Sequence, residues 1–407
     1  MRRWVAANID EIARDWVLRV YGACVALSYC LSAIYWLTGS IPNELVASAD
    51  AACWPGLEFC RSLRVLEHGG ISAYLVGLLI LSLASAALLV RARTVRWGYW
   101  LLVGCVIGKA LFMALDYRTR LNQHYMAFFA TIGLLLVPGK RDVLRLLVAL
   151  FYFWAGTLKL NHEWISGAAL YDQLWLLHGR LVPWACIYVI VLELAVVWLL
   201  FARSRRLFWL ALAQLAVFHL FSFELVGFFY PMLMYLLLAI FVLIRIDVGN
   251  SEVPLWTRVW RGRASRTGLS FALALSLLQL SPYLYGGDPA ISGEGRLLGL
   301  HMFDARVRCR GLAVARNQLG QKRELRPSRK FRRSTRMGCD PNIYIQFARN
   351  QCGREIEGFG RVADLDLELD SRKVTDGLWT RVIDHQGFCQ RPLRFDPIVP
   401  NDWMVER

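Results

Sequence analysis

Several ionisable side chains stand inside long apolar runs of this 407-residue chain. An ionised group at membrane depth is costly, so each one is a candidate for a functional role. A lysine amine that is partly removed from water has a lowered pKa and can act as a general base, with a histidine nearby to donate or accept a proton. The candidates are Lys109, Asp116, His124, Lys159, Glu193 and His219.

Lys159, His124 and His219 are expected to form a catalytic site. Lys159 closes one apolar run, His124 opens another, and His219 lies toward the end of a third. Alternating span directions bring these side chains to the same depth, where they would line a polar pocket open to one side of the membrane. In the alternative interpretation, the Lys159 amine extends to the interface and both histidines bind backbone carbonyls.

The other candidates are expected to be satisfied locally. Lys109 and Asp116 lie seven residues apart on one helix face, so they are expected to pair with each other or with a neighbouring helix. Glu193 lies near the middle of its run and needs a partner or a proton.

Membrane-spanning helices are the predicted elements that hold these groups. The chain is 56% hydrophobic with a mean hydropathy of +0.38, whereas soluble domains are about 45–50% apolar. Its apolar residues gather in runs of about 18–20, the length that crosses the hydrocarbon core. This pattern argues against a soluble enzyme and predicts an all-α bundle of about nine transmembrane helices over residues 1–285. They are expected at residues 17–38, 71–90, 97–116, 122–138, 143–160, 183–202, 207–224, 228–246 and 268–285.

Basic loops orient this predicted bundle. The net charge is +16, and much of it lies in short loops at residues 91–96, 139–141, 203–206 and 245–266. Positively charged loops stay in the cytoplasm, so we predict a cytoplasmic N-terminus, read as a short interfacial helix, and an extracytoplasmic C-terminus, in a periplasm or a lumen. The same distribution makes the lipid bilayer the expected partner and argues against nucleic acid.

Residues 286–407 are predicted to form a small β-rich extracytoplasmic domain. Alternating patterns predict strands at 296–310, 342–348 and 362–369. The basic stretch at 322–336 is expected to be a solvated loop, or else a surface for an acidic partner or lipid headgroups. Within the bundle, residues 161–182 are too apolar for a free loop and are expected to be re-entrant or interfacial.

Six cysteines are expected outside the membrane, where an oxidising compartment favours disulfides. Their pairing cannot be read from the sequence, and metal binding is the alternative, although no CxxC or HxxxH spacing supports a metal site. The six are Cys53, Cys60, Cys309, Cys339, Cys352 and Cys389. The four within predicted spans, Cys24, Cys30, Cys105 and Cys186, are expected to be packing residues.

Four segments resemble a known family. Residues 152–164 read YFWAGTLKLNHEW and resemble the YF-x-AG-x-x-KL-x-x-x-W segment of the vitamin K-dependent γ-carboxylases and of their bacterial relatives, the HTTM (horizontally transferred transmembrane) proteins. The other similar segments are residues 122–125, residues 218–220 with 226–231, and residues 341–347. The resemblance is thus spread over nearly the whole chain, and the bacterial relatives imply a bacterial inner membrane.

The resemblance implies a function for this site. Lys159 would be the base that deprotonates vitamin K hydroquinone or a related quinol, and His124 would support catalysis near the glutamyl substrate. A secreted peptide or protein would be the partner that is modified. The chain departs from the animal carboxylases in a shorter C-terminal region and in Thr157-Leu158-Lys159, which replaces their Val-Lys-Lys.

Three functions compete at this point. The first is a carboxylase-like enzyme that couples quinol oxygenation to modification of a glutamyl peptide. The second is a non-catalytic membrane factor that matures, escorts or confers immunity to a secreted peptide, with a structural lysine. A transporter is the least favoured, because the sequence shows no inverted halves with matched broken helices.

Overall fold

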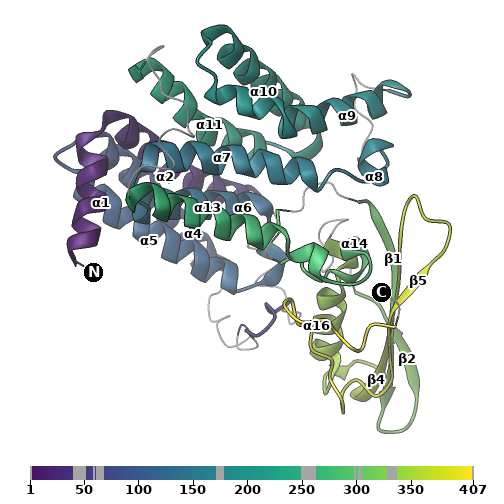
Figure 1. Ribbon diagram of the computed structural model, residues 1–407. Helices are drawn as coiled ribbons and strands as arrows, with labels where there is room; N and C mark the ends of the chain where they lie inside the picture. Colours follow the sequence, from purple (N-terminus) through teal and green to yellow (C-terminus); the bar gives the residue numbers. More distant parts are fainter. Residues whose placement is uncertain are drawn as a thin grey trace.

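A helical bundle and a small sheet domain make up the computed structural model, with the sheet domain against one end of the bundle (Figure 1). We call this the sheet end of the bundle, and the opposite end, where α1 lies, the α1 end. The described residues are 2–39, 52–57, 60, 68–170, 178–248, 263–297, 299–300, 305–327 and 337–405.

Six helical segments are long and apolar enough to cross a membrane, which indicates a multi-pass membrane protein. Many of their apolar side chains lie on the surface of the bundle, such as Ile80, Ile107 and Leu220, where lipid would cover them. The segments are α2 (Trp16–Thr38), α4 (His68–Val90), α5 (Val95–Ala114), α9 (Leu181–Leu194) continued by η3 (Val196–Phe201), α10 (Arg205–Val226) and α11 (Phe229–Val248).

The three remaining predicted spans are helical but do not meet the same criteria of length and composition. They are α6 (Asn122–Leu136), α7 (Lys140–Thr157) and α13 (Arg263–Gln279). The 15 residues of α6 reach only about 22 Å at 1.5 Å per residue, short of a hydrocarbon core of about 30 Å. Four charged residues stand in the first six positions of α7. The predicted count of about nine spans is therefore supported only for six.

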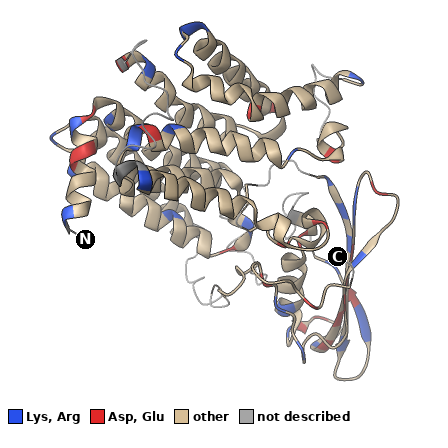
Figure 2. Cartoon of the chain, in the orientation of Figure 1, with Lys and Arg blue, Asp and Glu red and all other residues tan. Residues whose placement is uncertain are grey.

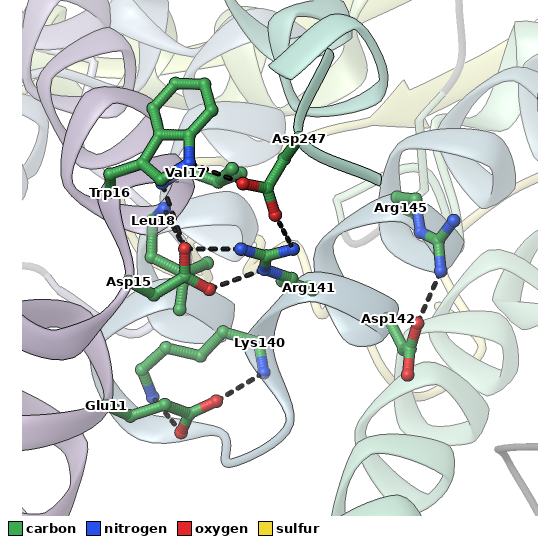
Figure 3. A network of polar contacts seen from close by, with 10 residues as sticks. All are labelled: Glu11, Asp15, Trp16, Val17, Leu18, Lys140, Arg141, Asp142, Arg145 and Asp247. Atoms are coloured by element: carbon green, nitrogen blue, oxygen red, sulfur yellow. Dashed lines mark hydrogen bonds and ion pairs between the residues drawn. The ribbon is translucent and has the colours of Figure 1, made fainter. Parts of the chain in front are cut away.

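Paired charges close the α1 end. The guanidinium of Arg141, at the start of α7, donates to Asp15 at 2.5 and 2.7 Å and to Asp247 at 2.6 Å. Trp16 donates to the same Asp247 (Figure 3). These contacts join α2, α7 and α11, beside α1 (Arg2–Arg14), the helix predicted at the N-terminus. Figure 2 shows that charged residues gather mostly at helix ends and on the sheet.

The sheet domain is a five-stranded antiparallel sheet with strand order β2-β1-β4-β3, in which β5 also pairs with β4. One face of β4 buries Val362, Leu365, Leu367 and Leu369 in the domain core. A helix, α16 (Pro341–Gln351), packs against β4. The strands are β1 (Val307–Asn317), β2 (Lys322–Leu325), β3 (Glu355–Ile356), β4 (Gly360–Lys373) and β5 (Thr380–His385).

One predicted strand of this domain is wrong. Residues 342–348 belong to the helix α16, which begins where the Asp340 side chain accepts a hydrogen bond from the backbone N–H of Asn342, with Pro341 at the first helical position. Every residue from 341 to 348 is buried. The alternation of apolar and polar residues in this segment therefore did not distinguish a buried face from an exposed face.

The other predictions for this domain have mixed outcomes. The strand at 362–369 is confirmed within β4. Of residues 296–310 only 307–310 are strand, and 298 and 301–304 lie outside the described residues. The basic stretch at 322–336 begins as the strand β2 rather than a loop, and its residues 328–336 also lie outside the described part.

Three disulfides confirm the expectation for the six cysteines outside the predicted spans: Cys53–Cys60, Cys309–Cys339 and Cys352–Cys389. The four cysteines Cys24, Cys30, Cys105 and Cys186 are free thiols within helices of the bundle.

Mass mapping under non-reducing conditions should find these three pairings. The free thiols should react with an alkylating reagent only after denaturation, because three of them are buried and Cys24 is partly buried. A different pairing, or six reactive thiols in the native protein, would contradict the structure.

Candidate functional site

A buried ion pair joins α7 to α9 at the sheet end. Lys159 follows the last turn of α7, and its Nζ lies 2.7 and 2.6 Å from Oε1 and Oε2 of Glu193. Their side chains are 3% and 0% exposed. The Trp164 ring covers the amine, with its centroid 5.2 Å from Nζ. Glu193 thus has the partner that its position required.

A glycine allows this close approach. A Cβ added to Gly156 would lie 2.9 Å from Leu194 Cδ2 and 3.0 Å from Glu193 Cβ. Only a residue without a side chain lets α9 come near enough for Glu193 to reach Lys159. Gly156, within the segment of residues 152–164, therefore helps to position the ion pair.

His219 lies in the same region of the bundle. Its Nε2 forms a 2.5 Å hydrogen bond with Tyr152 Oη, and the Tyr230 ring lies 5.4 Å away between centroids. Tyr152 lies on α7, seven residues before Lys159, which follows the end of that helix. The charge of Lys159 acts on His219, and that of Glu193 acts on Tyr152. We call these four residues the Lys159 cluster.

The predicted site thus gains two residues that sequence analysis did not assign to it. Glu193 was recognisable as the single acidic residue of its apolar run. Tyr152 lies seven residues before Lys159, the spacing at which side chains share a face where a helix continues, although α7 ends at Thr157. Neither of these sequence features shows that Glu193 pairs with Lys159 or that Tyr152 pairs with His219.

His124 lies in a second cluster, apart from Lys159. Its ring packs between Trp36, 4.6 Å away, and Phe229, 5.1 Å away between centroids. Lys109 acts electrostatically on it and donates a 2.9 Å hydrogen bond to Ser32 of α2. The start of α11 separates the two clusters, since Phe229 contacts His124 and the next residue contacts His219.

Lys109 and Asp116 therefore find different partners. Lys109 pairs with a neighbouring helix, which is one of the two predicted outcomes, because its Nζ donates a hydrogen bond to Ser32. Asp116 accepts from the guanidinium of Arg118 at 2.8 and 2.7 Å, within the turn that joins α5 to α6.

A cavity of about 210 Å³ lies near the end of α7, and none of the four residues of the Lys159 cluster lines it. Leu158 and Leu160, on either side of Lys159 in the chain, both line it. Tyr283 of η4 (Ser281–Leu284) lines it opposite α7, and Leu160 and Tyr283 are 58% and 61% exposed. Leu160 and Tyr283 give the cavity a partly apolar rim, whereas Glu163, Asp288 and Lys373 make the rest of its lining polar.

An ionic contact holds the sheet domain against this cavity. Lys373 of β4 lies 3.0 Å from Glu163 of α8 (His162–Ile165) and 2.7 Å from Asp288. Thr375 also donates to Glu163 at 2.8 Å. Burial opposes ionisation of Glu163, but the bonds from Thr375 and Lys373 outweigh it and lower the pKa of this carboxyl. Burial likewise opposes the charge of Lys373, and its two carboxylate partners raise the pKa of this amine.

Acid should loosen this contact. A lowered carboxyl pKa stabilises the docked state above the ordinary glutamate value, and this contribution is lost as the pH falls through the lowered pKa. We expect the hydrogen-exchange protection of residues 373–375, taken relative to the intrinsic rate at each pH, to fall below about pH 4.5. A Glu163→Gln variant should show the lower protection already at neutral pH and little further change in acid. The same acid response in both proteins would contradict the assignment.

No group of three His, Cys, Asp or Glu side chains suited to a metal ion occurs within the described ranges. Comparison of the chain with protein-family models, with curated proteins and with solved structures gave no match.

Proposed function

We propose that this chain is a carboxylase-like membrane enzyme of the HTTM and vitamin K-dependent γ-carboxylase type that deprotonates a quinol at the extracytoplasmic face. The observation that carries the proposal is the buried Lys159–Glu193 ion pair near a cavity with a partly apolar rim. A buried ion pair contributes little to stability when compared with apolar packing. The presence of this ion pair in an apolar bundle therefore favours a role in catalysis over a role in stability.

The ion pair offers both a proton acceptor and a counter-charge. Glu193 would take the proton from the quinol hydroxyl and become a neutral carboxylic acid. The ammonium of Lys159 would then face the phenolate oxygen in place of the glutamate. One O–H bond breaks and one forms, and the net charge of the site is unchanged. Exclusion of water strengthens the interaction between the new charges.

This assignment changes the role that the resemblance implies for Lys159. A lysine held by both oxygens of a carboxylate is a stabilising cation, and the carboxylate is the proton acceptor. His219 and Tyr152 would transfer the proton onward through their 2.5 Å hydrogen bond. His124 would support catalysis from the second cluster.

The quinol, a co-substrate of the vitamin K hydroquinone type, would supply the oxygen-dependent chemistry. In the resembling family this chemistry drives removal of a γ-proton from a glutamyl residue and uptake of CO2. The peptide substrate would approach from the side of the sheet domain, which borders the cavity through Lys373.

The proposed topology has nine spans, with the N-terminus in the cytoplasm and the sheet domain outside. Its support is that α6, α7 and α13 lie within the same bundle as the six apolar segments (Figure 1). A reporter fused after Arg407 should be active only outside the cytoplasm. Cytoplasmic activity would overturn this topology and the placement of the site.

Activity can be assayed with the protein purified in detergent. Reduced vitamin K, oxygen, bicarbonate and a glutamyl peptide should give oxidised quinone products and a carboxylated peptide, both measurable by mass spectrometry. Oxidised products without carboxylated peptide would identify a quinol oxygenase. No turnover of either substrate, with folded protein, would contradict the proposal and favour the non-catalytic maturation, escort or immunity factor.

A further inference from the structure

A buried lysine amine without a carboxylate partner lies in the second cluster. Lys109 is 3% exposed, and its Nζ donates to the neutral Ser32 and faces the Tyr29 ring at 4.8 Å from the centroid. Within the part of the chain that the structure describes, no carboxylate lies within 4 Å of this amine. An uncompensated charge at this depth costs several kcal/mol or more in general.

Unpaired hydrogen-bonding groups surround the same amine. His124 is 1% exposed, and neither of its ring nitrogens has a hydrogen-bond partner among the described residues. The same holds for Nε1 of Trp36, which is fully buried. The two rings lie 4.6 Å apart between centroids. Native proteins rarely leave such groups unsatisfied, so two neighbouring cases indicate that a water molecule or a ligand binds here.

We propose that Lys109, Trp36 and His124 bind a small monovalent anion. The ammonium supplies the charge, while the indole N–H and one imidazole N–H supply donors that an anion accepts. A water molecule would satisfy the donors but would leave the charge of Lys109 uncompensated. The inference does not depend on the proposed deprotonation by the Lys159–Glu193 pair, because it uses none of the four residues of the Lys159 cluster.

The walls of the site restrict the size of the anion. Phe112 packs on Trp36 at 4.5 Å, and Phe229 packs on His124 at 5.1 Å between centroids. Because these rings pack directly on the two proposed donors, we expect the site to accept only a small anion such as chloride, bicarbonate or formate. The same rings would exclude a large anion such as gluconate.

Binding of radiolabelled chloride and of radiolabelled bicarbonate to the purified full-length protein tests the proposal, with gluconate holding the ionic strength constant. We expect saturable binding of one anion per chain. Tighter binding of bicarbonate than of chloride would assign an oxyanion site, and the reverse would assign a halide site. No saturable binding of either anion would overturn the proposal.

Variants assign the binding to this cluster. Lys109→Met should abolish binding, and Trp36→Phe, which keeps the ring and removes one donor, should weaken it about tenfold. The combined Lys159→Met and Glu193→Gln variant is the matched control and should bind the anion normally. Unchanged binding in both Lys109→Met and Trp36→Phe would overturn the assignment. If Lys109→Met does not fold, unchanged binding in Trp36→Phe alone would overturn it.

Discussion

Replacement of Lys159 by methionine is expected to abolish quinol-dependent turnover, by about a thousandfold or more, because the site loses the cation that faces the phenolate. The same change leaves Glu193, which is fully buried, without its partner. Loss of one member of a buried ion pair generally costs about 3–5 kcal/mol of stability. Turnover and the thermal midpoint should therefore fall together, as measured by product formation and by unfolding in detergent.

A second variant separates the two effects. Lys159→Met combined with Glu193→Gln removes both charges and keeps the side-chain volumes similar, so it should recover most of the lost stability. It should remain inactive, because the proton acceptor is also gone. Turnover near that of the unmodified protein in this stable variant would show that the ion pair is structural.

Gly311→Ala is expected to be the most damaging small substitution in the sheet domain. A Cβ at this position of β1 would lie 1.9 Å from Cε1 of Tyr344, a buried residue of α16. Neither the backbone of β1 nor the Tyr344 ring can move away easily. The strand β4 holds the backbone of β1, and the ring is packed in the core of the domain. We expect a loss of about 3 kcal/mol and a fall in the domain's thermal midpoint of roughly 10 °C.

Limited proteolysis of the sheet domain during heating would measure this effect. Gly377→Ala is the matched control, since a Cβ there would have no atom within 4 Å. Adding Tyr344→Leu to Gly311→Ala should restore part of the midpoint by removing the clashing ring. Equal midpoints for the two alanine variants would contradict the packing described here.

The helices of the bundle were predictable because their signal is local. An apolar run of sufficient length needs no partner to be recognised, and all nine predicted runs are helical. The proximity of two of the candidate residues was predictable for a related reason. Lys159 and His219 were placed at one depth by span direction alone, and the structure brings them into one cluster.

What the sequence could not show is which helices touch. His124 was expected at the same depth as Lys159, but the start of α11 lies between the two clusters. The Lys159–Glu193 ion pair depends on how closely α9 approaches at Gly156, and the residue pattern of a single run does not state this distance. The helix α16 was mistaken for a strand because both of its sides are buried, so hydrophobic periodicity carried no information there.

The central claim is that the Lys159–Glu193 pair removes a proton from a quinol. Absorbance spectroscopy without oxygen tests this step alone, because the phenolate and the neutral quinol absorb at different wavelengths. The purified protein should convert bound vitamin K hydroquinone to its anion near neutral pH, and the Lys159→Met and Glu193→Gln double variant should leave it neutral. Equal amounts of anion with both proteins, or none with either when quinol binding is demonstrated, would contradict the account.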